Sequence, residues 1–416
     1  MKKASPPRRA SIVSIGNELL SGQTVSTNAA YLGERLFAIS IPIVSSYTIG
    51  DEIDSTVRAL KLASSDADII IATGGLGPTD DDLTRQGLAK FLGVELQLHN
   101  ELLDKIQNMF ARRERPMPER NKIQAYIPAG AKAIDNKLGT APGIMAESNG
   151  KLFFVLPGVP SEMKQMFEES VLPELQRFAG SQAIIIRKLK CFGTGESNIA
   201  EMLGDLMQRN RNPLINCTVE HGVITLCIVA AAKDKNQAEK MAEKDEKLLR
   251  NILGDLIYGV DEQTLAEVVG EKLARQNKKI ATAESCTGGT LAKLLTDIPG
   301  ASRYFTYGWI TYSNDAKISQ LDIPRDLINK YGAVSEQVAQ AMAQQARKKA
   351  DTDIAIGITG IAGPDGGSEQ KPVGLVYISV DTGSGCETRR FIFHHNRDSI
   401  RLRAAQTALN MLRLRL

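Results

Sequence analysis

The first 170 residues alternate short apolar runs with segments of helical spacing. Ala10–Ile15, Ile41–Tyr47 and Asp68–Ala72 have strand patterns, whereas Ile53–Leu62 and Leu83–Leu92 have the spacing of helices that are apolar on one face. The run that follows Asp68 is continuously apolar, which is typical of a parallel strand buried on both faces. This alternation predicts a doubly wound α/β sheet with a ligand at the carboxyl ends of its strands.

The next segment predicts a small α+β domain. Ala179, Gly180 and Ser181 mark a boundary before it. The pattern then predicts a strand at Ala183–Lys190, a helix at Ile199–Leu206 and a hairpin of the strands Pro213–Val219 and Gly222–Ala231. A charged helix at Lys235–Asn251 and a last strand at Leu256–Tyr258 follow. The domain's surface is charged and has no ladder of aromatic residues, so we interpret it as a spacer or a dimerisation module.

The α/β pattern returns after Thr264. It predicts helices at Leu265–Gln276 and Ser335–Lys349, and strands at Tyr304–Tyr312, Asp353–Ile358, Val373–Val380 and Glu387–His394. The basic, amphipathic segment from Arg401 to Leu416 predicts a helix that docks on the sheet. The chain is therefore divided into three domains, at residues 8–178, 180–259 and 262–416.

The amino-acid composition limits which partners, metals and catalytic residue types can be expected. Hydrophobic residues make up 43% and charged residues 24% of the 416, as in soluble globular proteins, and no run is long enough to cross a membrane. A net charge of +3 is too weak to argue for nucleic acid. The five cysteines form no CxxC pair, which favours a reducing, cytoplasmic compartment and argues against zinc. With four histidines, catalysis must depend mainly on Ser, Cys, Lys, Tyr and carboxylates.

The stretch Ala281-Thr-Ala-Glu-Ser-Cys-Thr-Gly-Gly289 runs from a predicted strand to a predicted helix start. Such a turn lifts a side chain out of the sheet and offers free backbone N–H groups and the positive end of a helix dipole to an oxyanion. Ser285 is the candidate nucleophile. Cys286 is a rival, because thiols are intrinsically more reactive. The simpler alternative is that Ser285 only caps the helix.

A serine nucleophile without a nearby histidine needs another base, and lysine is a known substitute. Lys317 follows a strand end and a polar turn, and it can point into the same cleft if it is buried enough to be neutral. Tyr312 can relay or orient the proton. The glycine-rich loop Thr359–Gly367 suits a phosphate or an oxyanion. Without the serine motif, the simplest interpretation of Lys317 would be an exposed surface lysine.

In the first domain, Thr73–Asp82 combines glycines with three consecutive acids. Asp80, Asp81 and Asp82 can hold a hard divalent ion that bridges a pyrophosphate, with Glu18 joining them. Arg85 lies one helical turn further and can pair with phosphate. The alternative is that the acids only cap a helix.

Four motifs in the first domain and four in the last together resemble the competence/damage-inducible protein CinA family. The first set is Gly16-Asn-Glu-Leu-Leu-Ser-Gly22, Gly74-Gly-Leu-Gly-Pro-Thr-Asp-Asp-Asp82, Leu138-Gly-Thr-Ala-Pro-Gly143 and Leu156-Pro-Gly-Val-Pro-Ser-Glu162. The second is Ala283-Glu-Ser-Cys-Thr-Gly-Gly289, Thr311-Tyr-Ser-Asn-Asp-Ala-Lys317, Gly332-Ala-Val-Ser-Glu336 and Gly360-Ile-Ala-Gly-Pro-Asp-Gly-Gly367. The match covers nearly the whole chain.

The resemblance implies a molybdopterin-binding-like first domain, a KH-type middle domain and a nicotinamide-nucleotide amidase as the last domain. It implies that the last domain hydrolyses nicotinamide mononucleotide to nicotinic acid mononucleotide and ammonia without a cofactor. It also implies that the first domain cleaves ADP-ribose with a divalent metal such as magnesium, manganese or cobalt, and that the protein is a homodimer. The middle domain has Gly193-Thr-Gly-Glu196 where an RNA-binding KH domain has a basic GXXG loop, so no direct nucleic-acid contact is expected.

The motifs and the resemblance together give the candidate site residues. In the last domain the catalytic residues are Ser285, Lys317 and Tyr312, and the substrate-binding residues are Cys286, Thr287, Gly288, Gly289, Asn314, Gly360, Ile361, Ala362 and Gly363. In the first domain the nucleotide-binding residues are Gly16, Asn17, Glu18, Asn28, Gly74, Gly75, Gly77, Thr79, Arg85, Pro157 and Gly158, and the metal ligands are Asp80, Asp81 and Asp82.

Two alternatives remain open at this point. The first domain can bind a pterin or nucleotide without doing chemistry on it. The protein can instead act mainly as a partner in DNA uptake or repair, although its weak net charge argues against direct DNA contact.

Overall fold

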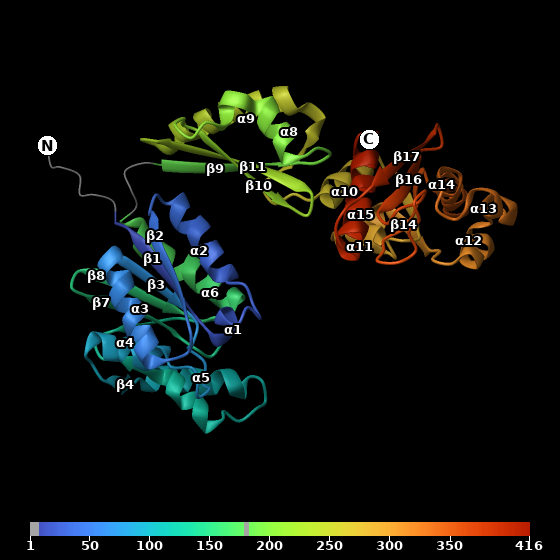
Figure 1. Cartoon of the computed structure of the whole chain (residues 1–416). Coiled ribbons are helices and arrows are strands. Elements are labelled where there is room, and N and C mark those ends of the chain that lie inside the picture. Colours follow the sequence, from blue (N-terminus) through green and yellow to red (C-terminus); the bar gives the residue numbers. More distant parts are fainter. Residues whose placement is uncertain (1–7, 179–182) are drawn as a thin grey trace. The chain divides into compact units, whose positions relative to one another are not determined.

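The computed structural model describes residues 8–178 and 183–416, so the predicted boundary at Ala179, Gly180 and Ser181 lies outside the described residues (Figure 1). The chain divides into two compact units. The first contains the N-terminal sheet. The second contains the C-terminal sheet and most of the middle domain.

The N-terminal domain is built on a six-stranded sheet with the order β2-β1-β3-β8-β7-β6. Its strands are β1 (Ala10–Ile15), β2 (Ile43–Ile49), β3 (Ile69–Thr73), β6 (Lys132–Ile134), β7 (Gly143–Ser148) and β8 (Lys151–Leu156). The first three and β8 pair in parallel, whereas β7 and β6 add an antiparallel edge. The predicted doubly wound α/β sheet is confirmed.

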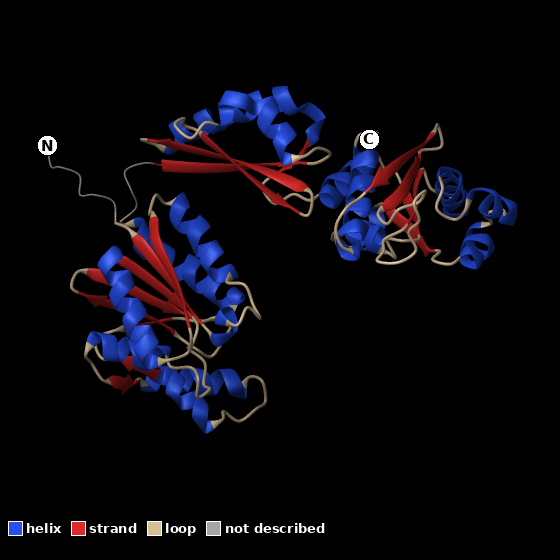
Figure 2. Cartoon of the chain, in the orientation of Figure 1, coloured by secondary structure: helices blue, strands red, loops and turns tan. Residues whose placement is uncertain are grey.

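Helices cover both faces of this sheet (Figures 1 and 2). Alternate residues of β1 and β3 point to opposite sides, so Ile12 packs in one core and Val13 in another. One face carries α2 (Thr27–Ala38), α6 (Pro160–Met166), the π-helical turn η2 (Phe167–Val171) and α7 (Leu172–Gln176). The other carries α3 (Ile53–Asp66) and α4 (Thr84–Leu92). The remaining elements are α1 (Asn17–Leu20), β4 (Leu96–Leu98), α5 (Asn100–Ala111), η1 (Glu119–Ala125) and β5 (Tyr126–Pro128).

The middle domain has a four-stranded sheet with the order β10-β11-β9-β12. Its elements are β9 (Ala183–Cys191), α8 (Glu196–Leu203), η3 (Gly204–Met207), β10 (Leu214–Glu220), β11 (Val223–Ala232), α9 (Lys235–Leu253), η4 (Gly254–Leu256) and β12 (Ile257–Val260). The predicted hairpin is present, because β10 and β11 pair antiparallel over their full length.

The C-terminal domain has a mixed five-stranded sheet with the order β14-β13-β15-β16-β17. The strands are β13 (Ile280–Glu284), β14 (Phe305–Ile310), β15 (Ile354–Gly360), β16 (Leu375–Asp381) and β17 (Cys386–Ile392). The first three are parallel, and the last two continue antiparallel.

Two helical layers enclose that sheet. One holds α10 (Leu265–Arg275), α11 (Thr290–Thr296) and α15 (Arg397–Arg413). The other holds α12 (Asn314–Leu321), α13 (Arg325–Tyr331) and α14 (Glu336–Ala350). A short turn, η5 (Ala301–Arg303), precedes β14. The predicted terminal helix therefore docks on the sheet, although it begins at Arg397 and buries Arg413.

Both large sheets reverse their strand order at one point. From β1 the chain passes to β2 on one side and to β3 on the other, and from β13 it passes to β14 and then to β15 in the same way. Ligands of open α/β sheets bind at such points, outside the carboxyl ends of the strands. Ser285 follows β13, and Gly16 and Gly74 follow β1 and β3.

None of the helices in residues 8–178 and 183–416 has both the length and the apolar character needed to cross a membrane.

Candidate functional site

The structure brings Ser285 and Lys317 together, although 31 residues separate them in the sequence. The Nζ atom of Lys317 lies 3.0 Å from Oγ of Ser285 and donates to the carbonyl oxygen of Thr311 at 2.8 Å. Both side chains are buried, with 8% of Ser285 and 1% of Lys317 exposed. The predicted convergence of an alcohol and an amine is therefore confirmed.

Helix α12 positions the lysine, and the sequence reading missed this helix. Ser313 caps it by accepting a hydrogen bond from the N–H of Ala316, and Lys317 comes one turn later on the inner side of the helix. Because β14 pairs in parallel with β13, the segment that follows β14 meets the segment that follows β13. A lysine that looked like a surface residue in the sequence is thus brought beneath the serine.

Burial changes the protonation of the lysine. Desolvation lowers the pKa of Lys317 from 10.5 to about 8, because the ammonium form loses its hydration. At neutral pH roughly a tenth of the amine is therefore uncharged, compared with less than a thousandth for an ordinary lysine. A neutral amine has a lone pair that can accept the hydroxyl proton of Ser285.

Cys286, the rival nucleophile, is in an unsuitable environment. Only 5% of the residue is exposed, and burial raises the pKa of its thiol to about 12. The nucleophilic form is the thiolate, which is scarcely populated at that pKa. The structure therefore favours Ser285 over Cys286.

The positive end of helix α11 does not face an incoming oxyanion, which corrects the expectation from the sequence. The buried carboxylate of Glu284 accepts hydrogen bonds from the N–H groups of Gly289 at 3.0 Å, Leu291 at 3.0 Å and Ala292 at 2.8 Å. It therefore occupies the N–H groups that the helix start would offer. The N–H of Gly288 donates to the carbonyl oxygen of Ser285 at 3.0 Å, so the remaining candidate donors are the N–H groups of Cys286 and Thr287, which lie against the thiol of Cys286.

Two arginines of α15, which the sequence reading did not select, contact the loops next to Ser285 and Lys317. Arg397 donates to the hydroxyl of Tyr312 at 2.8 Å and to the carbonyl oxygen of Gly363 at 2.6 Å. Arg401 donates twice to the carbonyl oxygen of Thr287, at 2.9 and 3.1 Å. The signal in the sequence was the spacing of two arginines by four residues at a helix start, which places both on one face.

Tyr312 is 59% exposed, and its hydroxyl accepts the hydrogen bond from Arg397. Among the hydrogen bonds found for the described residues, none joins it to Ser285 or Lys317, so the geometry assigns it to the rim. The other predicted substrate-binding residues are placed as follows: Thr287 is buried, Gly288 and Gly289 have left-handed backbones, and Asn314 is the exposed first residue of α12. Gly360 ends β15, and Ile361, Ala362 and Gly363 follow it.

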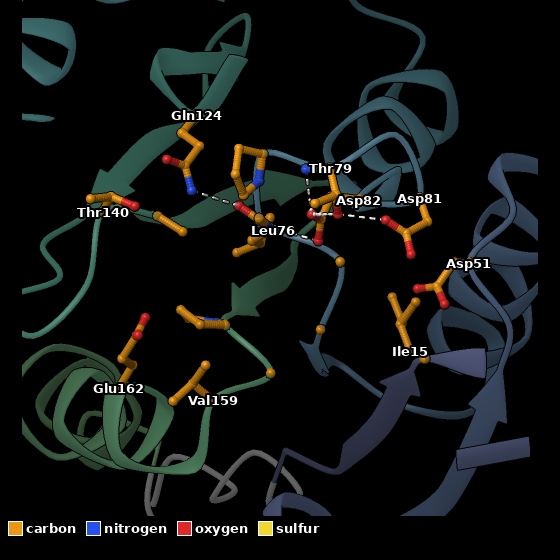
Figure 3. A pocket seen from close by; sticks show the side chains of 18 of the residues that line it. Ile15, Asp51, Leu76, Thr79, Asp81, Asp82, Gln124, Thr140, Val159 and Glu162 are labelled. Atoms are coloured by element: carbon orange, nitrogen blue, oxygen red, sulfur yellow. Dashed lines mark hydrogen bonds between the residues drawn. The ribbon is translucent and has the colours of Figure 1, made fainter. Parts of the chain in front are cut away.

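The N-terminal domain has a cavity of about 440 Å³ at the carboxyl ends of β1, β2, β3 and β8 (Figure 3). Of the predicted residues, Gly16, Glu18, Gly74, Gly75, Gly77, Thr79, Asp81, Asp82, Pro157 and Gly158 line it. Gly74 has a φ of +112°, and a Cβ there would lie 2.0 Å from the carbonyl oxygen of Ile15. Only glycine therefore allows this loop to pass so close to the end of β1.

The three consecutive aspartates do not form one ligand set, which corrects the predicted metal site. Asp81 and Asp82 line the cavity, whereas Asp80 lines a neighbouring one. Asp82 accepts hydrogen bonds from the N–H groups of Gly77 and Thr79, both at 2.8 Å, and so shapes the loop. Successive side chains of a turn point in different directions, and no group of three metal-ligating side chains was found among residues 8–178 and 183–416.

Arg85 does not reach the cavity, which corrects its predicted phosphate contact. It is fully buried and donates to the carbonyl oxygens of Leu76 and Gly77, so it braces the glycine-rich loop from behind. Burial lowers its pKa to about 10. Asn28 has a similar role, because its amide donates to the carbonyl oxygen of Gly158 at 2.9 Å, and the N–H of Asn17 donates to Asp51 at 2.8 Å.

Four polar residues that line this cavity were not among the predicted site residues: Asp51, Gln124, Thr140 and Glu162 (Figure 3). Asp51 and Gln124 lie outside the glycine-rich motifs, whereas Thr140 and Glu162 lie within two of them but were not chosen as ligand-binding residues. The pKa of Asp51 is raised, first by burial and then by the negative charges of Glu18, Asp81 and Asp82. Glu18, Asp51, Asp81 and Asp82 therefore line one cavity, and the charges of the other three act on Asp51.

Comparison with known families matches all three domains. Residues 11–177 match the family described as "Probable molybdopterin binding domain", residues 186–259 match "Damage-inducible protein CinA KH domain", and residues 262–416 match "CinA C-terminal domain".

Relatives extend over nearly the full length. A competence-damage inducible protein of Caldicellulosiruptor saccharolyticus is 44% identical over 404 residues, and one of Caldanaerobacter subterraneus is 45% identical over 405. Both matches cover 97% of this chain and 98% of the relative. A crystal structure of "the protein CinA with unknown function" from Thermoplasma acidophilum is 33% identical and covers 41% of this chain and 99% of that one, with a TM-score of 0.38.

The role of Glu284 gives a stability prediction. Glu284→Gln puts an amide N–H₂ against backbone N–H groups, so we expect the C-terminal domain to lose about 2–4 kcal/mol of unfolding free energy. The only tryptophan, Trp309, lies on β14, so its fluorescence during urea unfolding reports this domain alone. Glu336→Gln, an exposed acid in the first turn of α14, is the matched control and should cost less than about 0.5 kcal/mol. Equal losses in the two variants would contradict the assignment.

Proposed function

The chain belongs to the CinA family, and from this premise we propose that its C-terminal domain hydrolyses the carboxamide of nicotinamide mononucleotide. The products are nicotinic acid mononucleotide and ammonia. The observation that carries the proposal is the 3.0 Å approach of the Lys317 amine to the Ser285 hydroxyl, combined with a lysine pKa lowered to about 8. A serine beside a neutral lysine provides the nucleophile and the general base that acyl transfer needs when no histidine is present.

In the proposed reaction the neutral amine of Lys317 takes the proton of Ser285 as Oγ attacks the amide carbon. The resulting oxyanion accepts hydrogen bonds from the N–H groups of Cys286 and Thr287. The ammonium of Lys317 then returns its proton to the leaving nitrogen, and ammonia departs. Water, deprotonated by the same amine, hydrolyses the acyl-serine and restores the hydroxyl. The carbonyl oxygen of Thr311 keeps Nζ aimed at the serine throughout.

The two arginines of α15 support a substrate with a phosphate. Arg397 is exposed, and its guanidinium already bridges Tyr312, which precedes α12, and Gly363, which follows β15. Arg401 holds the turn that carries Ser285. Guanidinium groups recognise phosphate through paired hydrogen bonds, so Arg397 is the residue that suits the 5′-phosphate of a mononucleotide.

For the N-terminal domain we propose a second activity, the metal-dependent cleavage of ADP-ribose to AMP and ribose 5-phosphate. The cavity combines glycine backbone with carboxylates, and the hydrogen bond from Thr79 lowers the pKa of Asp81, which stays ionised. Its donors do not make a complete protein cage, but they fit Mg²⁺, which uses one or two carboxylates and completes its shell with water and substrate phosphates.

In this site Asp81 and Glu18 would be the protein carboxylates that hold the ion, and the ion would supply charge neutralisation for the pyrophosphate. The N–H groups of the Gly74–Gly77 loop would bind phosphate oxygens. Asp82 keeps that loop in shape from within, and Arg85 braces it from behind.

The dyad gives the first test. Ser285→Ala and Lys317→Met should each lower kcat for nicotinamide mononucleotide by about a thousandfold or more, because members of a catalytic unit act together. Ammonia release is the measurement. Cys286→Ala should keep at least about a third of the activity, since its thiol is protonated and buried. Full activity in Ser285→Ala with loss in Cys286→Ala would overturn the assignment.

The pH dependence gives the second test. Because the base must be neutral and its pKa is lowered to about 8, kcat should rise about tenfold per pH unit below pH 7 and level off above about pH 8.5. An unperturbed lysine would make kcat rise up to about pH 10.5 instead. A profile that falls between pH 7 and 9 would contradict lysine as the base.

The N-terminal proposal is tested with ADP-ribose and Mg²⁺. AMP should form, EDTA should abolish its formation, and Asp81→Asn should raise the Mg²⁺ concentration needed for half-maximal rate by about tenfold. Asp104→Asn, an exposed residue of α5, is the control. Tight binding of ADP-ribose without AMP would show that the domain only binds its ligand.

A further inference from the structure

A second cavity lies beside the first in the N-terminal domain. Its volume is about 660 Å³, and it shares the lining residues Pro78 and Thr79 with the 440 Å³ cavity. The turn η1 also contributes to both, since Gln124 lines the first and Ile123 the second. The loop after β3 and η1 therefore form a common rim, over which one elongated molecule can occupy both spaces.

The two cavities differ in chemistry. The first presents carboxylates and glycine backbone, which suit phosphates and a cation. The second has an apolar wall made of Leu83, Leu96, Ile123 and Tyr126. An aromatic ring and branched aliphatic side chains bind planar rings through stacking and exclusion of water.

Polar groups around that wall indicate which ring fits. Asp80, which does not face the first cavity, lines this one with an exposed carboxylate. Gln86 also lines it, and the Oε1 atom of Gln86 is shielded from water and accepts no hydrogen bond from the described residues. Both groups are acceptors that a ligand N–H would satisfy. Arg120 and Lys122 add donors.

We propose that this second cavity is the base subsite of the N-terminal domain, and that it selects a nucleotide whose ring carries an exocyclic amine. The ring packs on Tyr126 and Ile123, and its amine donates to Asp80. The phosphates extend over the Pro78–Thr79 rim into the first cavity. The inference rests on the proposed nucleotide ligand of this domain. It adds to that proposal the residues that recognise the base of the nucleotide.

Direct binding to the full chain tests it, independently of hydrolysis. Calorimetry with Mg²⁺ would compare ADP-ribose, its hypoxanthine analogue, in which the amine is replaced by a carbonyl oxygen, and inorganic pyrophosphate, which has no ring. We expect the analogue to bind the wild-type protein about tenfold more weakly than ADP-ribose. Tyr126→Ala and Ile123→Trp should each weaken ADP-ribose binding about tenfold or more, while pyrophosphate binding changes less than about twofold.

Asp80→Asn is the specificity variant, because asparagine can donate to a ring carbonyl. It should reduce the preference for ADP-ribose over the hypoxanthine analogue to less than about threefold. Phe37→Ala, at an exposed side chain of α2 outside both cavities, is the matched control and should bind like the wild type.

The outcomes separate this inference from the proposed reaction. If the wild type binds ADP-ribose in this pattern but forms no AMP, the base subsite stands and the hydrolytic proposal fails. If AMP forms while Tyr126→Ala, Ile123→Trp and Asp80→Asn all bind ADP-ribose within about twofold of the wild type, the subsite is wrong and the reaction stands. Failure of the wild type to bind ADP-ribose would overturn the inference.

Discussion

The candidate chemistry of the C-terminal domain depends on the burial of one amine, that of Lys317. Lys317 is 1% exposed, its Nζ is held by Thr311 and Ser285, and none of the ion pairs found among the described residues involves it. A buried ammonium without a counter-charge is costly, so the amine loses its proton at a lower pH than usual. The enclosure requires β14 beside β13 and a helix that turns back under Ser285. The fold thus fixes the protonation state that the proposed chemistry needs.

The two candidate sites follow the same topological rule with different chemistry. Each lies where the strand order reverses, between β1 and β3 in one sheet and between β13 and β15 in the other. In the N-terminal sheet the loops bring glycines and carboxylates to that point, whereas in the C-terminal sheet they bring a hydroxyl, an amine and two arginines. The position is set by the sheet, and the function is set by the loops.

The alternation of apolar runs was enough to predict both sheets and the strand ends where the sites lie. Periodicity could not show that Lys317 sits on a buried helix face, because α12 is short and mostly polar. It also could not separate Asp80 from Asp81 and Asp82, or show that Arg85 and Glu284 are buried braces for backbone groups. These outcomes depend on side-chain direction within turns and on long-range packing, which linear spacing does not encode.

The seclusion of Cys286 has a consequence for damage by peroxide. Oxidants attack thiolates that water can reach, and hydrolases with a cysteine nucleophile lose activity in this way. Here the thiol next to Ser285 is protonated and enclosed, and the proposed attacking group is an alcohol, which peroxide leaves intact. The proposed deamidation would therefore be less sensitive to peroxide than the reaction of a hydrolase with a cysteine nucleophile.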